Sequence, residues 1–377
     1  MDNQQQQQQL QLNNILQITA ETLDLSPTQH QEAVDKYRAV GDWLSADGSK
    51  LKQYRPNVYP HGSFALGTPV KPLGRSDFDI DLVIELFVPD GTPPAELKRM
   101  VGGRFAENQT YKAILEEMNR CWRLNYTTLH LDALPAQPKG AAGSAAILIP
   151  DKELRSYKDS DPKGYTAWFM LRCVISRSTG EARVEANVEP APDYHVWREK
   201  APLQVGIQLM KRHRDVYFQR KENPPISIIL TTLGATAYRQ EDNILATMRG
   251  MVDRMPLGIQ RIDGKAYVFN PVSHGENFAE KWHHEPEKEK AFFAWYAELK
   301  NDLAILERAA TLTEISKALE RFVGKNRADI VFKKYADQTT KARAAGLHID
   351  LATGILSTMG SSIGRRVPVP GNTFYGT

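Results

Sequence analysis

Cysteine is scarce in this chain, and its scarcity excludes two kinds of protein. Only Cys121 and Cys173 occur among the 377 residues. Two cysteines provide neither the framework of a disulfide-rich secreted domain nor the paired spacing of a structural zinc site. The chain therefore suits a reducing compartment, and we expect it in the cytoplasm.

Long apolar runs and an excess of charge of one sign are also missing. No stretch approaches the ~18 apolar residues of a membrane helix, and the N-terminus lacks the basic and apolar segments of a signal peptide. The 48 Lys and Arg side chains oppose 45 Asp and Glu side chains, which gives a net charge of +3. The composition therefore predicts no membrane partner and makes no strong case for nucleic-acid binding.

The most informative segment reads Asp-Phe-Asp-Ile-Asp-Leu-Val-Ile-Glu-Leu over residues 77–86. Side chains of a β-strand point alternately to opposite faces, so Asp79 and Asp81 share one face and the apolar residues share the other. Two neighbouring carboxylates repel each other unless a cation lies between them. Oxygen ligands suit Mg²⁺, with Mn²⁺ as the alternative. A solvated strand edge is the plainer interpretation of Asp-x-Asp alone.

A turn of small residues precedes this strand, in His-Gly-Ser-Phe-Ala-Leu-Gly over residues 61–67. Gly62 has no side chain to block the close approach of a ligand. Ser63 is expected to cap the following helix, whose free N–H groups would favour an anion. We expect Gly62 and Ser63 to hold the phosphates of a nucleotide beside the two carboxylates.

Two-metal phosphoryl transfer usually requires a third carboxylate, and Asp132 is the favoured candidate. Its segment, Leu-His-Leu-Asp-Ala-Leu-Pro, predicts a second strand with Asp132 on the polar face, which Pro135 is expected to end. Glu185 and Glu189 are the rivals, in a run that resembles an exposed hairpin arm. His130 shares the face of Asp132, but hard cations prefer oxygen, so we interpret it as a packing or hydrogen-bonding neighbour.

These residues resemble a known superfamily, the polymerase-β-like nucleotidyltransferases, in the arrangement of Gly62-Ser63, Asp79-x-Asp81 and Asp132. Further segments are similar to its cGAS/DncV-like branch, the CD-NTases of bacterial CBASS anti-phage systems. These segments are residues 147–152, 161–165 with Trp168-Phe169, 210–215, 225–230 and 374–376. The resemblance runs from about residue 28 to the C-terminus. The chain shows no Cys/His cluster like the zinc insert of animal cGAS.

The resemblance implies an α+β fold: a polymerase-β-like core of a mixed sheet with helices, braced by a long N-terminal helix, plus a C-terminal helical lobe. It implies synthesis of a cyclic di- or trinucleotide from nucleoside triphosphates, ATP among them, with release of pyrophosphate. Asp79, Asp81 and Asp132 would then be both the catalytic residues and the metal ligands.

In the second lobe the resemblance places a triphosphate-binding lysine at Lys211, within a basic cluster that could instead be a solvated helix face. Ser227 follows two prolines near a predicted helix start, where its hydroxyl and N–H could donate to a phosphate. A plain helix cap is the alternative for Ser227. Tyr165 and Tyr238 are two candidates for stacking on the base.

The chain divides into segments of different character. Ser26 to Gln29 form a capping box that predicts a long amphipathic helix, and residues 95–125 are expected to be mostly helical. The expected segments are a disordered Gln-rich lead-in over 1–25, the catalytic domain over 26–200, the helical nucleotide-binding lobe over 201–364 and a flexible tail over 365–377.

The tail carries Phe374 and Tyr375, bulky aromatics for which a solvated tail has no need. Some operons of the resembling family encode a ubiquitin-transfer-like enzyme that joins the C-terminus of the synthase to other molecules, so we expect such a partner to engage the tail. The terminal Thr377 departs from the commonest ending. Docking of the tail on its own helical lobe is the alternative.

Two other functions fit the same residues. One is a nucleotidyltransferase that modifies RNA, protein or a small molecule. The other is a non-catalytic nucleotide-binding module, against which the three carboxylates argue, because such a module has no reason to keep like charges together.

Overall fold

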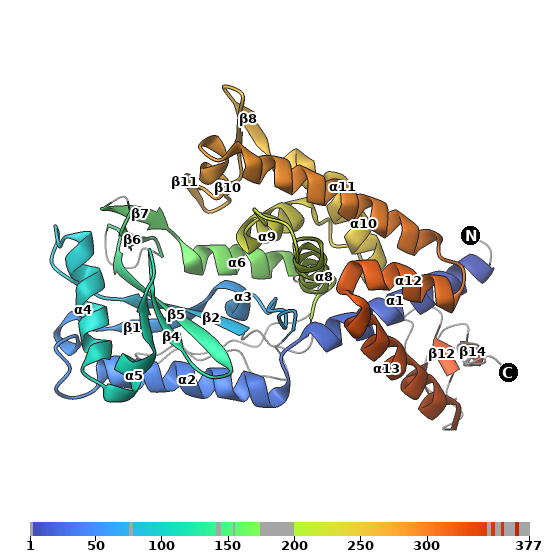
Figure 1. Cartoon of the computed structure of the whole chain (residues 1–377), viewed down its shortest axis with the longest axis horizontal. Coiled ribbons are helices and arrows are strands. Elements are labelled where there is room, and N and C mark those ends of the chain that lie inside the picture. Colours follow the sequence, from blue (N-terminus) through green and yellow to red (C-terminus); the bar gives the residue numbers. More distant parts are fainter. Residues whose placement is uncertain are drawn as a thin grey trace. The chain divides into compact units, whose positions relative to one another are not determined.

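The computed structural model describes residues 3–74, 78–140, 145–153, 155–173 and 200–344, with the backbone of three short strands beyond them. The chain divides into two compact units (Figure 1). The sheet unit comprises residues 25–204 and 267–279, and the helical unit comprises residues 1–24, 205–266 and 280–377. The long sheet segment ends at Gln204, whereas the sequence predicted a domain boundary after residue 200, and residues 1–24 and 267–279 belong to units that the sequence did not indicate.

A mixed sheet forms the centre of the sheet unit. Its strands follow the order β1-β2-β5-β4-β3, with β6 paired to the end of β5 and β7 paired to β6. Only the pairing of β2 with β5 is parallel. The strands are β1 Asn57–His61, β2 Phe78–Glu85, β3 Leu115–Glu117, β4 Trp122–Asn125, β5 Leu129–Pro138, β6 Ile147–Asp151 and β7 Ser156–Ser160.

One face of this sheet is packed into a large apolar core, as the alternation of the sequence predicted. Ile80, Leu82 and Ile84 of β2 are buried on this face, next to the alternate apolar residues of β5. Helices α2 (Pro27–Ser45), α4 (Pro94–Ala106) and α5 (Gln109–Ile114) also contribute to this core, as do β1 and β4. Burial of this face determines the register of both strands, because a slip of one residue would turn every side chain over.

The predicted capping box begins α2. The Ser26 hydroxyl accepts from the Gln29 N–H, and the Gln29 side chain accepts from the Ser26 N–H. The predicted apolar face of α2 is buried against the sheet. The helix ends at Ser45, and the chain then turns through Gly48, whose φ of +85° lies in the left-handed region.

The opposite face of the sheet carries a smaller cluster of Tyr59, Val83, Ala136, Ile147 and Ile149. Helix α6 (Pro162–Cys173) contacts β1 on this side. The ammonium of Lys163 on this helix lies 4.2 Å from the centre of the Tyr59 ring. The cluster covers only one end of this face. The other end is where the polar residues of β2 and β5 lie.

Residues 95–125 are mostly helical, as predicted, through α4 and α5, but two unexpected strands, β3 and β4, follow α5 directly. A second prediction for the sheet unit was wrong. Pro135 does not end its strand, because β5 continues to Pro138. Pairing with β4 stops at Ala133 and pairing with β6 begins at Gln137, so Pro135 lies where β5 has only β2 as a neighbour.

The helical unit is built from long helices. Helix α1 packs against α10 and α13, and α11, α12 and α13 pack in succession (Figure 1). The helices are α1 Asn3–Leu23, α8 Pro202–Tyr217 (from Val205 on), α9 Ser227–Ala237, α10 Ile244–Arg254, α11 Pro286–Arg308, α12 Leu312–Val323 and α13 Lys325–Ala344.

The remaining elements are short. They are α3 Gly62–Ala65, η1 Lys52–Tyr54, η2 Met255–Gly258, η3 Glu280–His283, β8 Gln260–Ile262, β9 Lys265–Tyr267, β10 Phe269–Asn270, β11 Ser273–Asn277, β12 His348–Asp350, β13 Leu356–Ser357 and β14 Arg366–Pro368. Strand β14 pairs with β12, which corrects the prediction of a flexible tail from residue 365 onwards. None of the helices among the described residues is long and apolar enough to cross a membrane.

The prediction of a disordered lead-in over residues 1–25 was wrong. Residues 3–23 form α1, and Leu12, Ile15 and Leu16 on it are buried. Gln11 donates to the Tyr335 hydroxyl at 2.9 Å, and the Asn13 side chain accepts from the first turn of α10. Glutamine is a good helix former, and the apolar residues after the glutamine run give the helix a face to bury.

Replacing Leu16 by alanine should lower the free energy of unfolding by about 2–5 kcal/mol, the usual cost of removing a buried leucine side chain. Urea unfolding followed by circular dichroism measures the change. Gln7→Ala, at an exposed position of the same helix, is the matched control and should change little. Equal behaviour of the two variants would contradict the packing of α1.

Candidate active site

The parallel pairing of β2 with β5 brings the predicted carboxylates together. Asp81 lies directly opposite Asp132, and Asp79 lies opposite His130. Neighbouring strands are about 4.8 Å apart, so the three carboxylates occupy one small area on the polar face of the sheet. Asp79 and Asp81 share that face, as the alternation of β2 predicted.

Gly62 lies against this group. Strand β1 ends at His61, which pairs with Asp81, and the chain then turns at Gly62 with a φ of +60°. A Cβ atom at Gly62 would clash with Oδ2 of Asp81. Only glycine fits here, because the backbone occupies the space beside the carboxylate.

The prediction that Ser63 caps the next helix was wrong. Helix α3 begins at Gly62, its N-cap is His61, and no side chain caps it. Ser63 lies in the first turn, and its carbonyl oxygen accepts from the Thr68 N–H at 2.9 Å. Burial lowers the pKa of the His61 imidazole to about 4, so this side chain is neutral at physiological pH.

The far end of the turn is fixed by two side chains from the end of the sheet unit. Gln204 donates to the Leu66 carbonyl at 2.8 Å, and Lys200 donates to the Gly67 carbonyl at 2.7 Å. Gly67 has a φ of +65°, and a Cβ there would lie 2.6 Å from the Gln204 amide nitrogen. The turn over residues 62–67 is therefore held at both ends.

Arg123 on β4 is the residue of this site that the sequence did not reveal. It lies opposite Asp132, and its Nε and Nη2 donate to the two carboxylate oxygens, each at 2.7 Å. Its Nη2 is also 4.0 Å from Oδ1 of Asp79, which lies 3.4 Å from Nδ1 of His130. This fork is the strong, bidentate form of a charged hydrogen bond. No motif marked Arg123, because β4 was expected to be helical.

Charge and burial oppose each other at Asp79. Burial raises the pKa of its carboxyl, and the Arg123 guanidinium beside it lowers that pKa, while the Asp132 carboxylate raises it again. The hydrogen bond to Asp132 raises the pKa of Arg123 itself. Arg123 therefore supplies the positive charge that the three carboxylates require.

The chemistry of these residues fits a hard divalent cation, because the three side chains offer only oxygen donors. In the part of the chain that the structure describes, no three acidic, histidine or cysteine side chains are grouped as a ready metal centre. At Asp132 both carboxylate oxygens accept from Arg123. Because Gly62 has no Cβ, there is space beside its backbone for the carboxylate of Asp81.

Lys211 and Ser227 belong to the helical unit, whereas the carboxylates belong to the sheet unit. Lys211 is 5% exposed and its neighbours Arg212 and His213 are 1% exposed, so the basic cluster is not a solvated face. Ser227 is the first residue of α9 rather than its cap, and its hydroxyl accepts from Arg214 at 2.9 Å. The phosphate-binding roles of Lys211 and Ser227 stay predictions.

The other candidates have separate outcomes. Tyr165 and Tyr238 are each 4% exposed, so neither ring presents an open face for a base. Tyr165 packs against Phe278, with ring centres 6.0 Å apart. Glu185, Glu189 and the terminal residues from 369 on lie outside the described residues.

Comparisons with known proteins agree with this geometry. Residues 10–172 match the model of the Second Messenger Oligonucleotide or Dinucleotide Synthetase domain. The chain is 32% identical over 372 residues to a c-di-GMP synthase from Roseivirga ehrenbergii, covering 97% of each protein. It is 27% identical over 299 residues to the cyclic dinucleotide synthase CdnG from Bradyrhizobium diazoefficiens, covering 72% of this chain and 70% of CdnG.

Solved structures show the same fold. The structure of the B. diazoefficiens CD-NTase CdnG in complex with GTP matches with a TM-score of 0.69 at 22% identity, covering 86% of this chain and 99% of CdnG. The complex of CdnC from Escherichia coli MS115-1 with a HORMA protein matches with a TM-score of 0.58 at 13% identity, covering 81% and 95%. Identity to a curated synthase over nearly its whole length decides the family: this chain belongs to the CD-NTases, the polymerase-β-like nucleotidyltransferases that synthesise cyclic oligonucleotides.

Proposed function

We propose that this enzyme makes a cyclic dinucleotide and that GTP is its preferred substrate. The support is the c-di-GMP synthase that is 32% identical over 97% of both proteins, together with the similarity to CdnG, whose structure holds GTP. ATP, which the sequence suggested, is the competing substrate. The proposed setting is CBASS anti-phage defence in the cytoplasm.

The observation that carries the mechanism is the pairing of Asp81 with Asp132 across two parallel strands, beside the missing side chain of Gly62. CD-NTases generally use divalent metal ions, and we propose Asp79, Asp81 and Asp132 as the ligands of Mg²⁺ or Mn²⁺. The bound ions would neutralise the triphosphate and lower the pKa of the acceptor hydroxyl. Gly62 and Ser63 would let the phosphate chain approach the strand.

The reaction then consists of two steps with the same chemistry. A ribose hydroxyl of one nucleotide attacks the α-phosphate of the other, the new phosphodiester forms, and pyrophosphate leaves. A second attack within the linear intermediate closes the ring. Asp132 orients the attacking hydroxyl and must loosen its hold on Arg123 to do so, since both of its oxygens are engaged. Catalysis is positioning and charge neutralisation, without a covalent enzyme intermediate.

We also propose that Lys211 and Ser227 bind the triphosphate from the helical unit. Lys211 is a buried ammonium, which can act as a point charge on the β- and γ-phosphates. Ser227 begins α9, where both hydroxyl and N–H can donate.

A partner of the ubiquitin-transfer type is proposed for the C-terminal tail. Strand β14 ends at Pro368, so residues 369–377 follow the last described element. Phe374 and Tyr375 would insert into a pocket of the partner. A HORMA protein binds the relative CdnC, so a HORMA partner is the second candidate.

Asp79→Asn should lower the synthesis of cyclic product by about 100-fold or more, the scale of losing one electrostatic contact to the transition state. The melting temperature should stay level or rise, because the change relieves repulsion from Asp132. Mass spectrometry after incubation with GTP, ATP or both and Mg²⁺ identifies the product. Asp90→Asn, at an exposed position, is the control. A full yield of cyclic product from the Asp79 variant would contradict the mechanism.

Asp132→Asn should lower kcat far more than it weakens triphosphate binding, because Asp132 serves the attacking hydroxyl. Calorimetric titration with a non-hydrolysable GTP analogue gives the Kd, and pyrophosphate release gives kcat. An unchanged kcat would mean that Asp132 is not the third metal ligand and would favour Glu185 or Glu189 in that role.

Truncation after Pro368 keeps β14 and removes only the proposed partner segment. Synthesis in vitro should be unchanged, and conjugation to the tail by the ubiquitin-transfer-like enzyme should be lost. The full chain carrying Phe374→Ala and Tyr375→Ala should show the same loss of conjugation. A fall of several degrees in melting temperature, or crippled synthesis, would mean instead that the tail is part of the fold.

A further inference from the structure

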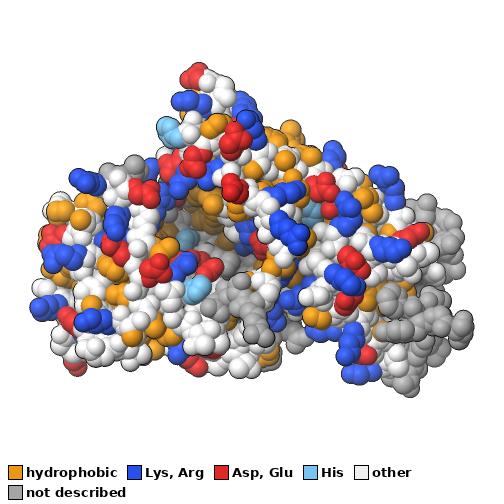
Figure 2. Space-filling model, in the orientation of Figure 1, with side chains coloured by type: hydrophobic (Ala, Val, Ile, Leu, Met, Phe, Trp, Pro, Cys, Tyr) orange, Lys and Arg blue, Asp and Glu red, His pale blue; other side chains and the backbone are white. Residues whose placement is uncertain are grey.

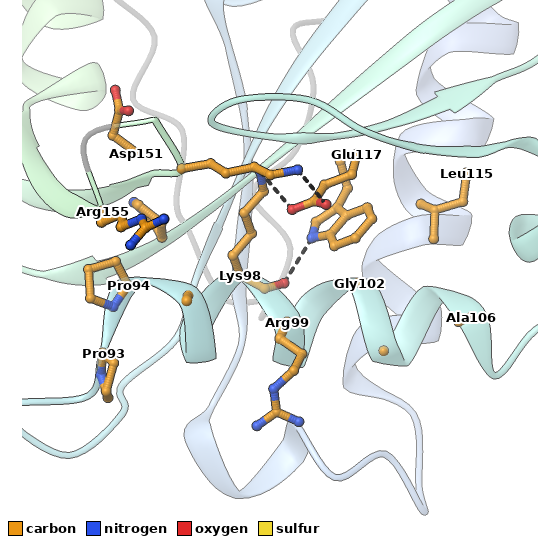
Figure 3. A pocket seen from close by; sticks show the side chains of 15 residues that line it. Pro93, Pro94, Lys98, Arg99, Gly102, Ala106, Leu115, Glu117, Asp151 and Arg155 are labelled. Carbon is orange, nitrogen blue, oxygen red and sulfur yellow. Dashed lines mark hydrogen bonds and ion pairs between the residues drawn. The ribbon is translucent and has the colours of Figure 1, made fainter.

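A pocket lies in the sheet unit, between α4, the β3–β4 hairpin and the β6–β7 turn (Figure 3). Its volume is about 700 Å³, which falls within the range of small-molecule sites, roughly 300–1,000 Å³. The catalytic carboxylates are not among the residues that line it.

The floor of the pocket is apolar and firmly built. The Trp122 indole is half-buried, and its Nε1 donates to the Lys98 carbonyl of α4 at 2.8 Å. A Cβ at Gly102 would clash with the Trp122 ring, so the ring lies directly on the helix. One residue on, a Cβ at Gly103 would meet no atom within 4 Å. The helix thus presents open space beside an aromatic surface.

The acidic side chains of the pocket are already neutralised. Glu117 lies 3.3 Å from Nζ of Lys98 and accepts from Lys152 at 2.9 Å (Figure 3). Asp151 accepts from Arg120 at 2.9 Å. Lys98 is also occupied, because its ammonium donates to the carbonyls of Met118 and Asn119.

Two cations of the pocket have no such partner. Arg99 on α4 and Arg155 before β7 are both exposed. No carboxylate of the described residues lies within ion-pair distance of either guanidinium. The lining therefore combines an apolar, aromatic floor with two available guanidinium groups, which are suited to planar acidic groups.

Strand β4 connects this pocket to the carboxylates. Trp122 and Arg123 are adjacent on β4, and side chains of adjacent strand residues point to opposite faces. Trp122 faces the pocket, whereas Arg123 holds Asp132. Both residues are paired with β5, opposite Ala133 and Asp132. A shift of β4 would move the Trp122 ring and the Arg123 fork together.

We propose that this pocket binds a small acidic molecule with a flat ring system, and that its occupancy changes the rate of synthesis through β4. The ring would stack on Trp122, and the acidic group would pair with Arg99 and Arg155. The ligand site stands on this geometry alone, whereas the effect on rate rests on the proposed role of Asp132. Such coupling is reciprocal. If the ligand alters Asp132, a change at Asp132 must also alter the affinity of the pocket for the ligand.

The probe is 1-anilinonaphthalene-8-sulfonate, which carries a flat ring system and one acidic group and fluoresces when bound. The full chain should bind it saturably at one site. Gly103→Leu should abolish that binding without loss of melting temperature, because leucine has room there and favours a helix. Arg99→Gln with Arg155→Gln should weaken it by about tenfold or more.

Lys112 provides the matched controls, since it is exposed on α5 and does not line the pocket. Lys112→Leu and Lys112→Gln should both bind the probe as the unchanged chain does. Equal binding by the Gly103→Leu variant would overturn the site.

A saturating probe should change the rate of cyclic product formation in the unchanged chain and have no effect on Gly103→Leu. An unaltered rate in the unchanged chain would overturn the connection through β4. A chain that makes no cyclic product with any nucleoside triphosphate would refute the proposed function, while the fluorescence titration would still decide the ligand site.

Discussion

The parallel pairing of β2 with β5 is the constraint on which the rest of the sheet unit depends. It places Asp81 opposite Asp132 and leaves Asp79 beside them, so three like charges share one face of the sheet. Such a group is unfavourable unless positive charge is near. Arg123 provides that charge with a bidentate hydrogen bond. The turn at Gly62, which only glycine can form against Asp81, completes a surface suited to cations and phosphates.

The two faces of the sheet have different roles. The apolar residues of the face that packs against α2, α4 and α5 hold the register of the strands. The side chains of the other face therefore need not stabilise the fold. Strand β4 takes part in both. Trp122 packs on α4, and Arg123 engages Asp132. Rigid burial on one side is therefore what positions the polar chemistry on the other.

The helical unit shows how burial alters the meaning of charge. A run of Lys, Arg, His and Arg on a helix usually indicates a solvated face, yet Lys211, Arg212 and His213 are all buried. His213 accepts from the Trp295 indole through Nδ1 at 3.0 Å, and its Nε2 lies 3.2 Å from Asp302. The Trp295 donor requires Nδ1 to be the acceptor, so the Nε2 proton points to Asp302. Part of the basic cluster is thus a structural network.

The sequence alone determined the local features, because alternation, capping and glycine act over a few residues. The strand of Asp79 and Asp81, the polar face of Asp132 and the capping box at Ser26 were all predictable. Tertiary structure decided the rest. A run of glutamines became α1 because distant helices cover its apolar face, and Pro135 stays within β5 because that strand has a single neighbour there. Arg123 meets Asp132 only through the pairing of β4 with β5, a contact that no spacing along the chain encodes.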